Sequence, residues 1–396
     1  MTRRLYYTDA RRTEFTATVV GRADDGRRIY LDETAFYPTS GGQPFDTGTL
    51  DGARVVDVVD EEDRIAHVLD RPLPADTHQV RGTVDWARRW DHMQQHTGQH
   101  LLSAVFEDLL GHRTVSVHFG AESSTLDLDA AGVSAQALAR VEARANELVS
   151  QAIPVAVTFE DAATAAGLRK ATGRTGEIRI VTIAGVDRSA CGGTHVATTA
   201  EIGAVLLRRT EKVKQGTRVE FVCGGRAIER ARADLSALSR VAQALSSSLD
   251  EAPASLEARL AHAQQVEGAA RKLERELDAY RARERYDAAA PDTRGVRRVI
   301  ERRPAGTLDD LRGLAHAVCA LPGAAFIGVI EESGAIIVGT SEDSALEAGP
   351  VLKRALALVQ GKGGGSPRMA QGSAPAAEVD HVIAAVLQEW DAPRSA

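Results

Sequence analysis

The sequence predicts a multidomain α+β protein, because its hydrophobic pattern changes character along the 396 residues. Short alternating runs give way near Trp86 to a helical period, a segment rich in Ala, Leu, Arg and Glu follows, and α/β character returns at the end. A chain of this length is also too long for one hydrophobic core. The predicted parts are a small N-terminal β-barrel (1–88), an α+β domain (89–225), a helical hairpin linker (226–290) and a C-terminal α/β domain (291–396).

The first 88 residues contain short alternating runs separated by Gly, Asp and Pro, a spacing typical of a small barrel or sandwich. The segment FYPTSGGQPFDTG (36–48) interrupts this pattern. Its prolines and glycines make the backbone too irregular for a strand, so we expect a loop there.

The second part begins with a helix that we expect to run from Trp86 to a stop at Gly111. A second helix is expected over 134–150. Strand-like segments surround it, and the last of them has the form of a hairpin around Gln215–Gly216. The predicted strand segments are 114–120, 124–129, 153–160, 177–185 and 205–224.

The third part has leucines at spacings of three and four on both sides of Pro253, which predicts two long helices, paired antiparallel. In the fourth part we expect a strand hairpin (324–341) with its turn at Ser333–Gly334. A helix (347–359), a loop (361–373) and a last helix (377–390) complete the prediction.

Composition narrows the class of protein. The net charge is −7, which argues against non-specific binding of nucleic acid over the whole surface. No apolar run approaches 18 residues and no secretory signal follows Met1, so we expect no membrane span. The three widely spaced cysteines do not form a disulfide framework, which favours the reducing cytoplasm.

The charge is unevenly distributed. Between Arg169 and Arg218 ten Lys or Arg residues face four acidic ones, so this segment carries +6 and the rest of the chain −13. A basic patch of this kind can hold a phosphate backbone. The alternative is a solvated face with scattered arginines.

Two short motifs contain metal-ligating side chains four positions apart. His96 and His100 lie in MQQHTGQHLL, where helical spacing puts them on one face. Cys191 and His195 lie in SACGGTHVAT, where the two glycines favour a tight turn. Three imidazoles and a thiolate form a ligand set suited to Zn²⁺. Four ligands would close a structural site, whereas three would leave a position for water, and the sequence leaves both possibilities open.

These motifs carry a resemblance to a known family. QQHTGQHLLSAVF together with CGGTHV closely resembles the editing domain shared by alanyl- and threonyl-tRNA synthetases and by free-standing alanyl-tRNA editing proteins (AlaX). FYPTSGGQPFDTG resembles the glycine-rich loop of the barrel that precedes this domain in the longer AlaX proteins. GKGGGSPRMAQGS is similar to the C-terminal loop of the DHHA1 domain, so the resemblance covers essentially the whole chain.

The resemblance implies that His96, His100, Cys191 and His195 bind one zinc ion per chain. It implies hydrolysis of a wrong amino acid, usually serine and sometimes glycine, esterified to the 3′ end of alanine tRNA. Zinc can polarise an ester carbonyl or position a water. Mischarged tRNA(Ala) is the expected partner, no membrane is involved, and a homodimer through the helical linker and the C-terminal domain is a further expectation.

Alanine must be spared, so we expect discrimination through the hydroxyl of serine. RTVSVHFG resembles the family's pocket strand, and alternation places Thr114, Ser116 and His118 on one face, as the residues of the catalytic pocket. The alternative is a strand with polar residues on an exposed face.

Further contacts to the substrate or tRNA are expected from two glycine-rich segments and from the basic stretch. The alternative interpretation of TSGGQP is a plain turn that makes no contact with the substrate or tRNA. The candidate residues are Gly41, Gly42, Gln43, Gly192, Gly193, Arg208, Arg209, Lys212 and Lys214.

Three other functions are alternatives to this prediction. A complete alanyl-tRNA synthetase is not expected, because the predicted barrel begins almost at Met1. A DHHA1-type phosphoesterase would need an Asp-His-His run, and the nearest match is DHM at Asp91–Met93. A non-catalytic tRNA-binding protein could dispense with the metal, and the retained four-ligand set argues against it.

Overall fold

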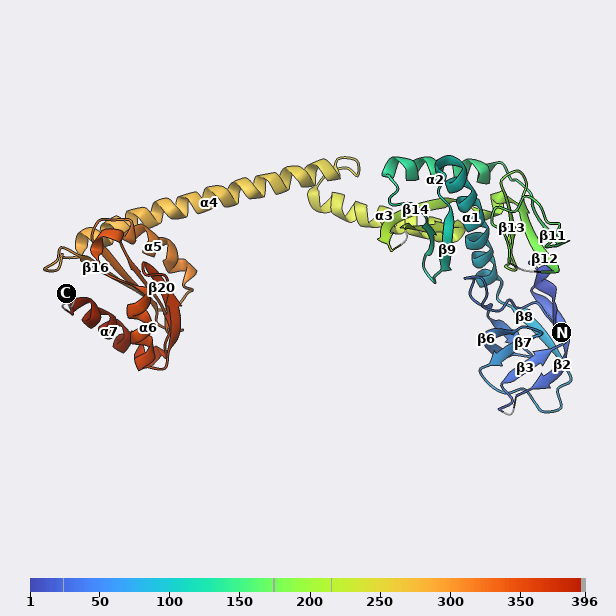
Figure 1. The fold of residues 1–396 in the computed structure, drawn as a ribbon, viewed down its shortest axis with the longest axis horizontal. Coiled ribbons are helices and arrows are strands. Elements are labelled where there is room, and N and C mark those ends of the chain that lie inside the picture. Colours follow the sequence, from blue (N-terminus) through green and yellow to red (C-terminus); the bar gives the residue numbers. More distant parts are fainter. Residues whose placement is uncertain (24, 174, 215, 393–396) are drawn as a thin grey trace. The chain divides into compact units, whose positions relative to one another are not determined.

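The computed structural model describes residues 1–396 except 24, 174, 215 and 393–396. The chain divides into two compact units, Met1–Val241 and Ala242–Ala396, which are described separately (Figure 1). In the part of the chain so described, no helix combines the length and the apolar character needed to cross a membrane.

The first unit begins with strands that close into a ring, in the order β2-β3-β7-β6-β5-β8, with β8 pairing back onto β2. Inward-facing residues such as Phe15, Ile29, Leu50 and Val80 form its core. The short strands β1 (Arg3–Arg4) and β4 (Glu33–Thr34) pair in parallel beside it. The ring strands are β2 (Glu14–Arg22), β3 (Arg28–Leu31), β5 (Gly48–Leu50), β6 (Ala53–Glu61), β7 (Arg64–Leu69) and β8 (Gln79–Val84).

Helix α1 (Trp86–Leu110) follows the ring and is the centre of the first unit. The side chain of Asp85 accepts a hydrogen bond from the backbone of Arg88 at its start, and Gly111, with φ of 69°, ends it as predicted. Residues 92–106 are all buried, because strands and a second helix surround α1. In Figure 1, β9 and β14 lie on one side of α1 and β11, β12 and β13 on the other.

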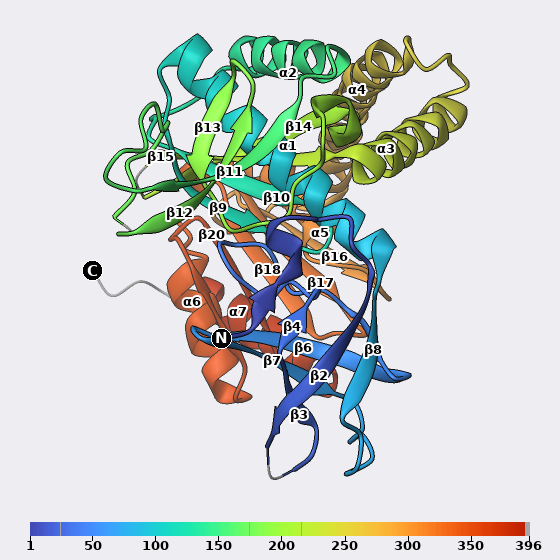
Figure 2. The ribbon, with the colours of Figure 1, turned by 90° about the vertical axis from the view of Figure 1, so that its right-hand side faces the viewer.

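Two sheets and helix α2 (Ala135–Ser150) pack around α1. The four-stranded sheet has the order β14-β15-β10-β9 and the three-stranded sheet the order β11-β12-β13. Figure 2 shows α2 on the side of these sheets away from the ring. Gln215, in the predicted hairpin turn, lies outside the described residues. The strands are β9 (Thr114–Phe119), β10 (Ser124–Leu128), β11 (Val155–Asp161), β12 (Glu177–Ile183), β13 (Asp187–Ala190), β14 (Val205–Val213) and β15 (Gly216–Cys223).

A buried ion pair joins α1 to the ring. Arg89 and Asp46 are both fully buried, and the Nε of Arg89 donates to Asp46 Oδ1 and Oδ2 over 3.1 and 3.0 Å. Arg89 also donates to the carbonyls of Ala10 and Ala35. Breaking such a pair leaves an uncompensated buried charge, so these bonds fix the position of α1 against the glycine-rich loop that contains Asp46.

The predicted long helices are present as α3 (Gly224–Leu245) and α4 (Ala252–Ala288), and their antiparallel pairing stays a prediction. In the second unit a sheet with the order β16-β17-β18-β20-β19 packs against α5 (Asp309–Cys319), α6 (Gly349–Leu358) and α7 (Val379–Asp391). Its strands are β16 (Arg297–Arg303), β17 (Ala324–Ile330), β18 (Ala335–Thr340), β19 (Lys362–Gly365) and β20 (Met369–Ser373).

The segment predicted as a loop over 361–373 is instead largely the β19–β20 hairpin, so that prediction was wrong. The glycines allow a close backbone approach: a Cβ on Gly363 would lie 2.7 Å from the carbonyl oxygen of Gln371. Local composition suggested a loop, because glycine is rare in strands unless another backbone comes this near.

Candidate metal centre

The structure brings the four predicted ligands together inside the first unit. His96 and His100 project from α1, and Cys191 and His195 follow strand β13. Their ligand atoms all lie within 4.8 Å of one another, and the Sγ of Cys191 is 3.4 and 3.3 Å from the Nε2 atoms of His96 and His195. Zinc bonds to nitrogen and sulfur of about 2.0–2.3 Å put tetrahedral ligands roughly 3.3–3.8 Å apart. The donor set therefore fits such an ion.

The Nδ1 atom of each imidazole, on the side away from the cluster, has a hydrogen-bond partner. His96 Nδ1 donates to Gln43 Oε1 over 2.8 Å, and His100 Nδ1 donates to Asp187 Oδ2 over 2.8 Å. His195 Nδ1 lies 3.1 Å from the hydroxyl oxygen of Thr97. Protonation at Nδ1 leaves Nε2 as the metal-binding atom, which is the arrangement that outer hydrogen bonds impose on metal-ligating histidines.

Asp187 connects the centre to an arginine. Its buried carboxylate accepts hydrogen bonds from His100, from Arg169 Nε over 2.6 Å and from the hydroxyl of Ser189. Burial alone would raise the pKa of Asp187, but the bonds from His100 and Arg169 hold it below its usual value. The charged carboxylate therefore keeps His100 oriented.

The pKa of the Cys191 thiol is lowered by its surroundings, which favours the thiolate. Burial by itself would raise its pKa, yet the imidazoles of His96, His195 and His100 hold that pKa well below the ordinary value of 9.0. The thiolate, which is the form that binds a metal, is therefore favoured.

The glycines of CGGTH have a packing role that the sequence did not reveal. A Cβ on Gly193 would lie 2.1 Å from Cε1 of His96, so only glycine leaves room for this imidazole. Arg179, on β12, donates to the carbonyls of Cys191 and Gly193 over 2.7 and 2.9 Å and thereby fixes the turn. Gly192 and Gly193 also line a cavity.

The glycine-rich loop reaches the metal centre through Gln43. Gly41 and Gly42 have φ of 57° and 87°, a left-handed conformation that favours glycine. The turn they make directs the fully buried Gln43 toward His96, and Gln43 Nε2 also donates to the hydroxyl of Thr194 over 2.9 Å. Gln43 thus lies behind a ligand, whereas Gly41 lines the neighbouring cavities.

The three predicted pocket residues do not share one face, so that expectation was wrong. A register shift between Asp127 and Leu128 pairs Thr114 with Leu128 on the face toward α1, where Thr114 Oγ1 lies 2.8 Å from Ser103 Oγ. Ser116 instead pairs with Asp127, and its hydroxyl donates to that carboxylate over 2.8 Å. The exposed His118 is on the same outward face as Ser116, as alternation predicts. Thr114 is on the other face because the β-bulge lies between Thr114 and Ser116.

Two cavities meet at the metal centre. Thr114, Ser116 and Arg169 line the smaller one, of about 330 Å³, and Cys191 and Gly192 line the larger one, of about 470 Å³. The residues that line both are Gly41, Gln99, His100, Val117, Lys170 and Ala190. Lys170 is therefore a cation at the junction of the two cavities. The sequence analysis identified it only as one of the ten basic residues between Arg169 and Arg218.

The other basic candidates lie elsewhere in the first unit. Arg208, Arg209 and Lys212 are on β14, at the opposite edge of the sheet from β9, and the exposed Lys214 follows that strand. Arg208 pairs with Asp234 and Arg209 with Glu220. Their role in binding tRNA stays a prediction.

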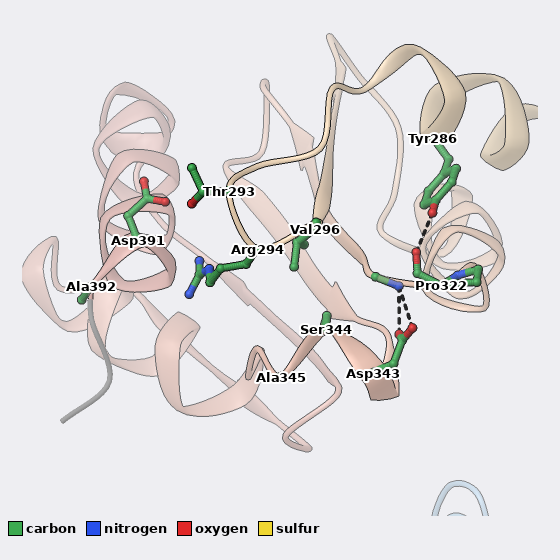
Figure 3. Close-up of a pocket in the computed structure, with 12 residues that line it drawn as sticks. Tyr286, Thr293, Arg294, Val296, Pro322, Asp343, Ser344, Ala345, Asp391 and Ala392 are labelled. Atoms are coloured by element: carbon green, nitrogen blue, oxygen red, sulfur yellow. Dashed lines mark hydrogen bonds between the residues drawn. The ribbon is translucent and has the colours of Figure 1, made fainter. Parts of the chain in front are cut away.

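The second unit has a cavity of its own, of about 690 Å³ (Figure 3). On one side of it, the hydroxyl of Tyr286 donates to the carbonyl of Pro322, and Asp343 accepts a hydrogen bond from the backbone of Gly323. The described residues that line it include neither His nor Cys, so it offers none of the soft ligands found in the first unit.

Two family models match parts of the chain. Residues 178–220 match the threonyl and alanyl tRNA synthetase second additional domain, and residues 298–390 match the DHHA1 domain. The alanine–tRNA ligase of Halorubrum lacusprofundi is 35% identical over 95% of this chain and 42% of its own length. The alanyl-tRNA editing protein AlaX-L of Pyrococcus horikoshii is 35% identical over 58% of this chain and 60% of its own length.

The alanyl-tRNA editing protein Aarsd1 of Bos taurus is also 35% identical, over 56% of this chain and 54% of its own length. The chain thus spans about half the length of the curated relatives that it matches. The comparisons find both predicted domains in the predicted order. The chain therefore contains a second additional domain of the threonyl and alanyl tRNA synthetases and a DHHA1 domain, and it is similar to alanine–tRNA ligases over nearly all of its length and to alanyl-tRNA editing proteins over a little more than half of it.

Proposed function

We propose that the chain is a trans-editing hydrolase that deacylates mischarged Ser-tRNA(Ala), with Gly-tRNA(Ala) as a second substrate. The observation that carries this proposal is a buried cluster of His96, His100, Cys191 and His195 at the junction of two cavities. Relatives named for alanyl-tRNA editing support the substrate class.

The ligand set favours one zinc ion per chain. Bound there, the ion would supply polarisation of an ester carbonyl or orientation of a water. The surrounding residues of the chain orient the ligands. Gln43, Thr97 and Asp187 hold the imidazoles, and Arg179 holds the turn that carries Cys191.

Recognition of serine requires a partner for its hydroxyl, and Thr114 is the residue we propose. Thr114 lines the smaller cavity, and its Oγ1 forms a chain of hydrogen bonds with Ser103 and Gln99, each link 2.8 Å long. A site that hydrogen-bonds a hydroxyl rejects the substrate that lacks one far better than a site that measures size. Alanyl-tRNA would then be spared.

Two other functions are less well supported. A non-catalytic tRNA-binding protein would have no use for a buried ligand cluster whose three imidazoles each have an outer partner. A phosphoesterase site at Asp91 is disfavoured because the carboxylate of Asp91 is engaged by Arg226, over 2.7 and 2.6 Å.

The expected partner is mischarged tRNA(Ala). We also propose that the chain forms a homodimer through the helical linker and the C-terminal domain, and that it is located in the cytoplasm. The test of the function is to incubate the full chain with seryl-, glycyl- and alanyl-tRNA(Ala). We expect serine to be released fastest and alanine at the rate of the buffer control. If none of the three esters is hydrolysed faster with the protein than in buffer alone, the proposal is refuted.

A further inference from the structure

A third cavity of the first unit, of about 380 Å³, adjoins the smaller cavity at the metal centre. Five residues line both of these cavities, namely Thr114, Val115, Arg169, Lys170 and Ala171. The metal ligand His100 lines the smaller cavity, whereas none of the four metal ligands lines the third. The third cavity is therefore a separate compartment that a small molecule can enter from the metal centre through the smaller cavity.

The part of the third cavity that the smaller one lacks is lined by charged side chains. Glu107 lies in the last turn of α1, Arg113 directly precedes β9, and Asp129 directly follows β10. Arg113 and Asp129 form an ion pair, with 3.1 Å between Nε and Oδ2. Arg169, in the shared wall, is paired with the buried Asp187. These two arginines are therefore already neutralised by carboxylates of the chain.

Two opposite charges of the third cavity are left without partners. In the part of the chain that the structure describes, neither the Glu107 carboxylate nor the Lys170 ammonium has an ion-pair or hydrogen-bond partner. Glu107 is half-buried at the carboxyl end of α1, where the helix dipole disfavours a negative charge. A cation beside Glu107 and an anion beside the exposed Lys170 would both be stabilised.

Hydrolysis of the proposed substrate releases a molecule with this pair of charges. The oxygen of a water molecule joins the acyl carbon, the bond from that carbon to the ribose oxygen breaks, and the ribose oxygen keeps one of the two protons. The other proton passes to solvent, because a carboxyl group is ionised at neutral pH. The ester carries an α-ammonium group alone, whereas the released amino acid carries an α-ammonium and a carboxylate.

A phosphate backbone fits the third cavity less well than an amino acid does. Binding of nucleic acid is driven by Lys and Arg that neutralise phosphates. Here Glu107 is an unpaired carboxylate, which repels a phosphate and attracts an ammonium group. The volume of the cavity also lies within the range of roughly 300–1,000 Å³ that is typical of sites for small molecules.

We propose that the third cavity binds the free α-amino acid released by hydrolysis, with its carboxylate at Lys170 and its ammonium group at Glu107. This inference rests on the proposed function, because it assigns a place to the product of that reaction. Lys170 lines the smaller, the larger and the third cavity, so it meets the new carboxylate at the metal centre and holds it in the third cavity. The reactive cavity is thereby vacated for the next ester.

The test is a ligand-observed NMR titration of the full chain with L-serine. Ethanolamine, which lacks the carboxylate, and 3-hydroxypropanoate, which lacks the ammonium group, should each bind about threefold to fivefold more weakly than serine, as expected for partly exposed ion pairs. Lys170→Met and Glu107→Gln should each weaken serine binding by the same factor. Lys353→Met on α6 and Glu229→Gln on α3 remove exposed charges outside these cavities and are the matched controls.

Three results would overturn the inference. One is the absence of saturable serine binding to the wild type, and another is a loss of affinity in the control variants equal to that in Lys170→Met and Glu107→Gln. The third is weaker binding in only one of those two variants; tighter binding in Glu107→Gln, in particular, would identify a site for anions such as phosphate. The titration requires no catalysis, so it decides on this site even if the protein releases no serine from Ser-tRNA(Ala) and the proposed function fails.

Discussion

The imidazole of His100 donates its Nδ1 proton to the carboxylate of Asp187, over 2.8 Å. Both groups are buried, and Asp187 is held in turn by Arg169. A ligand histidine on one element is thus oriented by a carboxylate that lies 87 residues further along the chain.

Replacing Asp187 by Asn keeps the shape of the side chain but removes its charge. Outer partners of metal-ligating histidines are worth about 10–100-fold in metal affinity, so we expect zinc binding to weaken by that factor. Competition with a chromophoric chelator measures it. Asp127→Asn removes a carboxylate that pairs with Arg218 away from the ligands, and it should keep the wild-type affinity.

Gly193→Ala tests the packing of the CGGTH turn. The new methyl group would lie 2.1 Å from Cε1 of His96, so the imidazole must move and the ligand cluster must open. We expect the purified variant to contain well under one zinc per chain by elemental analysis. Gly268→Ala in helix α4, where a Cβ meets nothing within 4 Å, should keep its metal and gain about 1 kcal/mol in helix stability. Full zinc content in Gly193→Ala would contradict this account of the turn.

Thr114→Val tests recognition of the serine hydroxyl. Losing a hydrogen bond to substrate costs about 1–3 kcal/mol, so kcat/KM for Ser-tRNA(Ala) should fall about tenfold to a hundredfold. Rates of serine release under single-turnover conditions measure this. Thr125→Val, on the outward face of the adjacent strand β10, is the control. Equal losses in both variants would show that the effect is not specific to the pocket.

The buried His67 makes the stability of the first unit depend on pH. Its Nδ1 donates to the carbonyl of Ile29 and its Nε2 accepts from Thr34, so the ring is neutral. Burial lowers the pKa of His67 from 6.5 to about 4. The unfolded chain therefore binds the proton more readily between these values, and the free energy of unfolding should fall by up to about 3 kcal/mol as the pH drops through this window.

Urea unfolding at pH 7, 6 and 5 measures this loss. His67→Gln should be less stable than the wild type at pH 7 but should lose less stability on acidification. His78→Gln, an exposed control, should keep the wild-type dependence on pH. Identical pH dependence in His67→Gln and the wild type would rule out this histidine as the cause.

The ligands of the metal centre were predictable because their chemistry is written in short motifs. The sequence contains two histidines four positions apart on a predicted helix, and a cysteine and a histidine that flank two glycines. These patterns predict the set of metal ligands without any knowledge of the fold. The limit of helix α1 at Gly111 was predictable for a similar reason, since glycine in the left-handed region ends helices.

The outer partners were not predictable in this way. Asp187 and Arg179 belong to no motif and reach the centre only through tertiary packing, and Thr97 lies within the histidine motif but its contact with His195 also depends on that packing. The β-bulge beside Leu128 shifted the predicted face of Thr114, because alternation assumes an unbroken strand. The sequence predicts Gln43 as a contact to the substrate or tRNA, but only the structure shows that it bonds to His96.

The most direct test of the central claim is to measure zinc content and Ser-tRNA(Ala) deacylation together in Cys191→Ala. Cys319→Ala, which removes a thiol in the second unit, is the matched control. We predict that Cys191→Ala loses most of its zinc and at least tenfold of its deacylation rate while the second unit stays folded, and that Cys319→Ala keeps both. Full deacylation by a zinc-free Cys191→Ala protein would contradict the account.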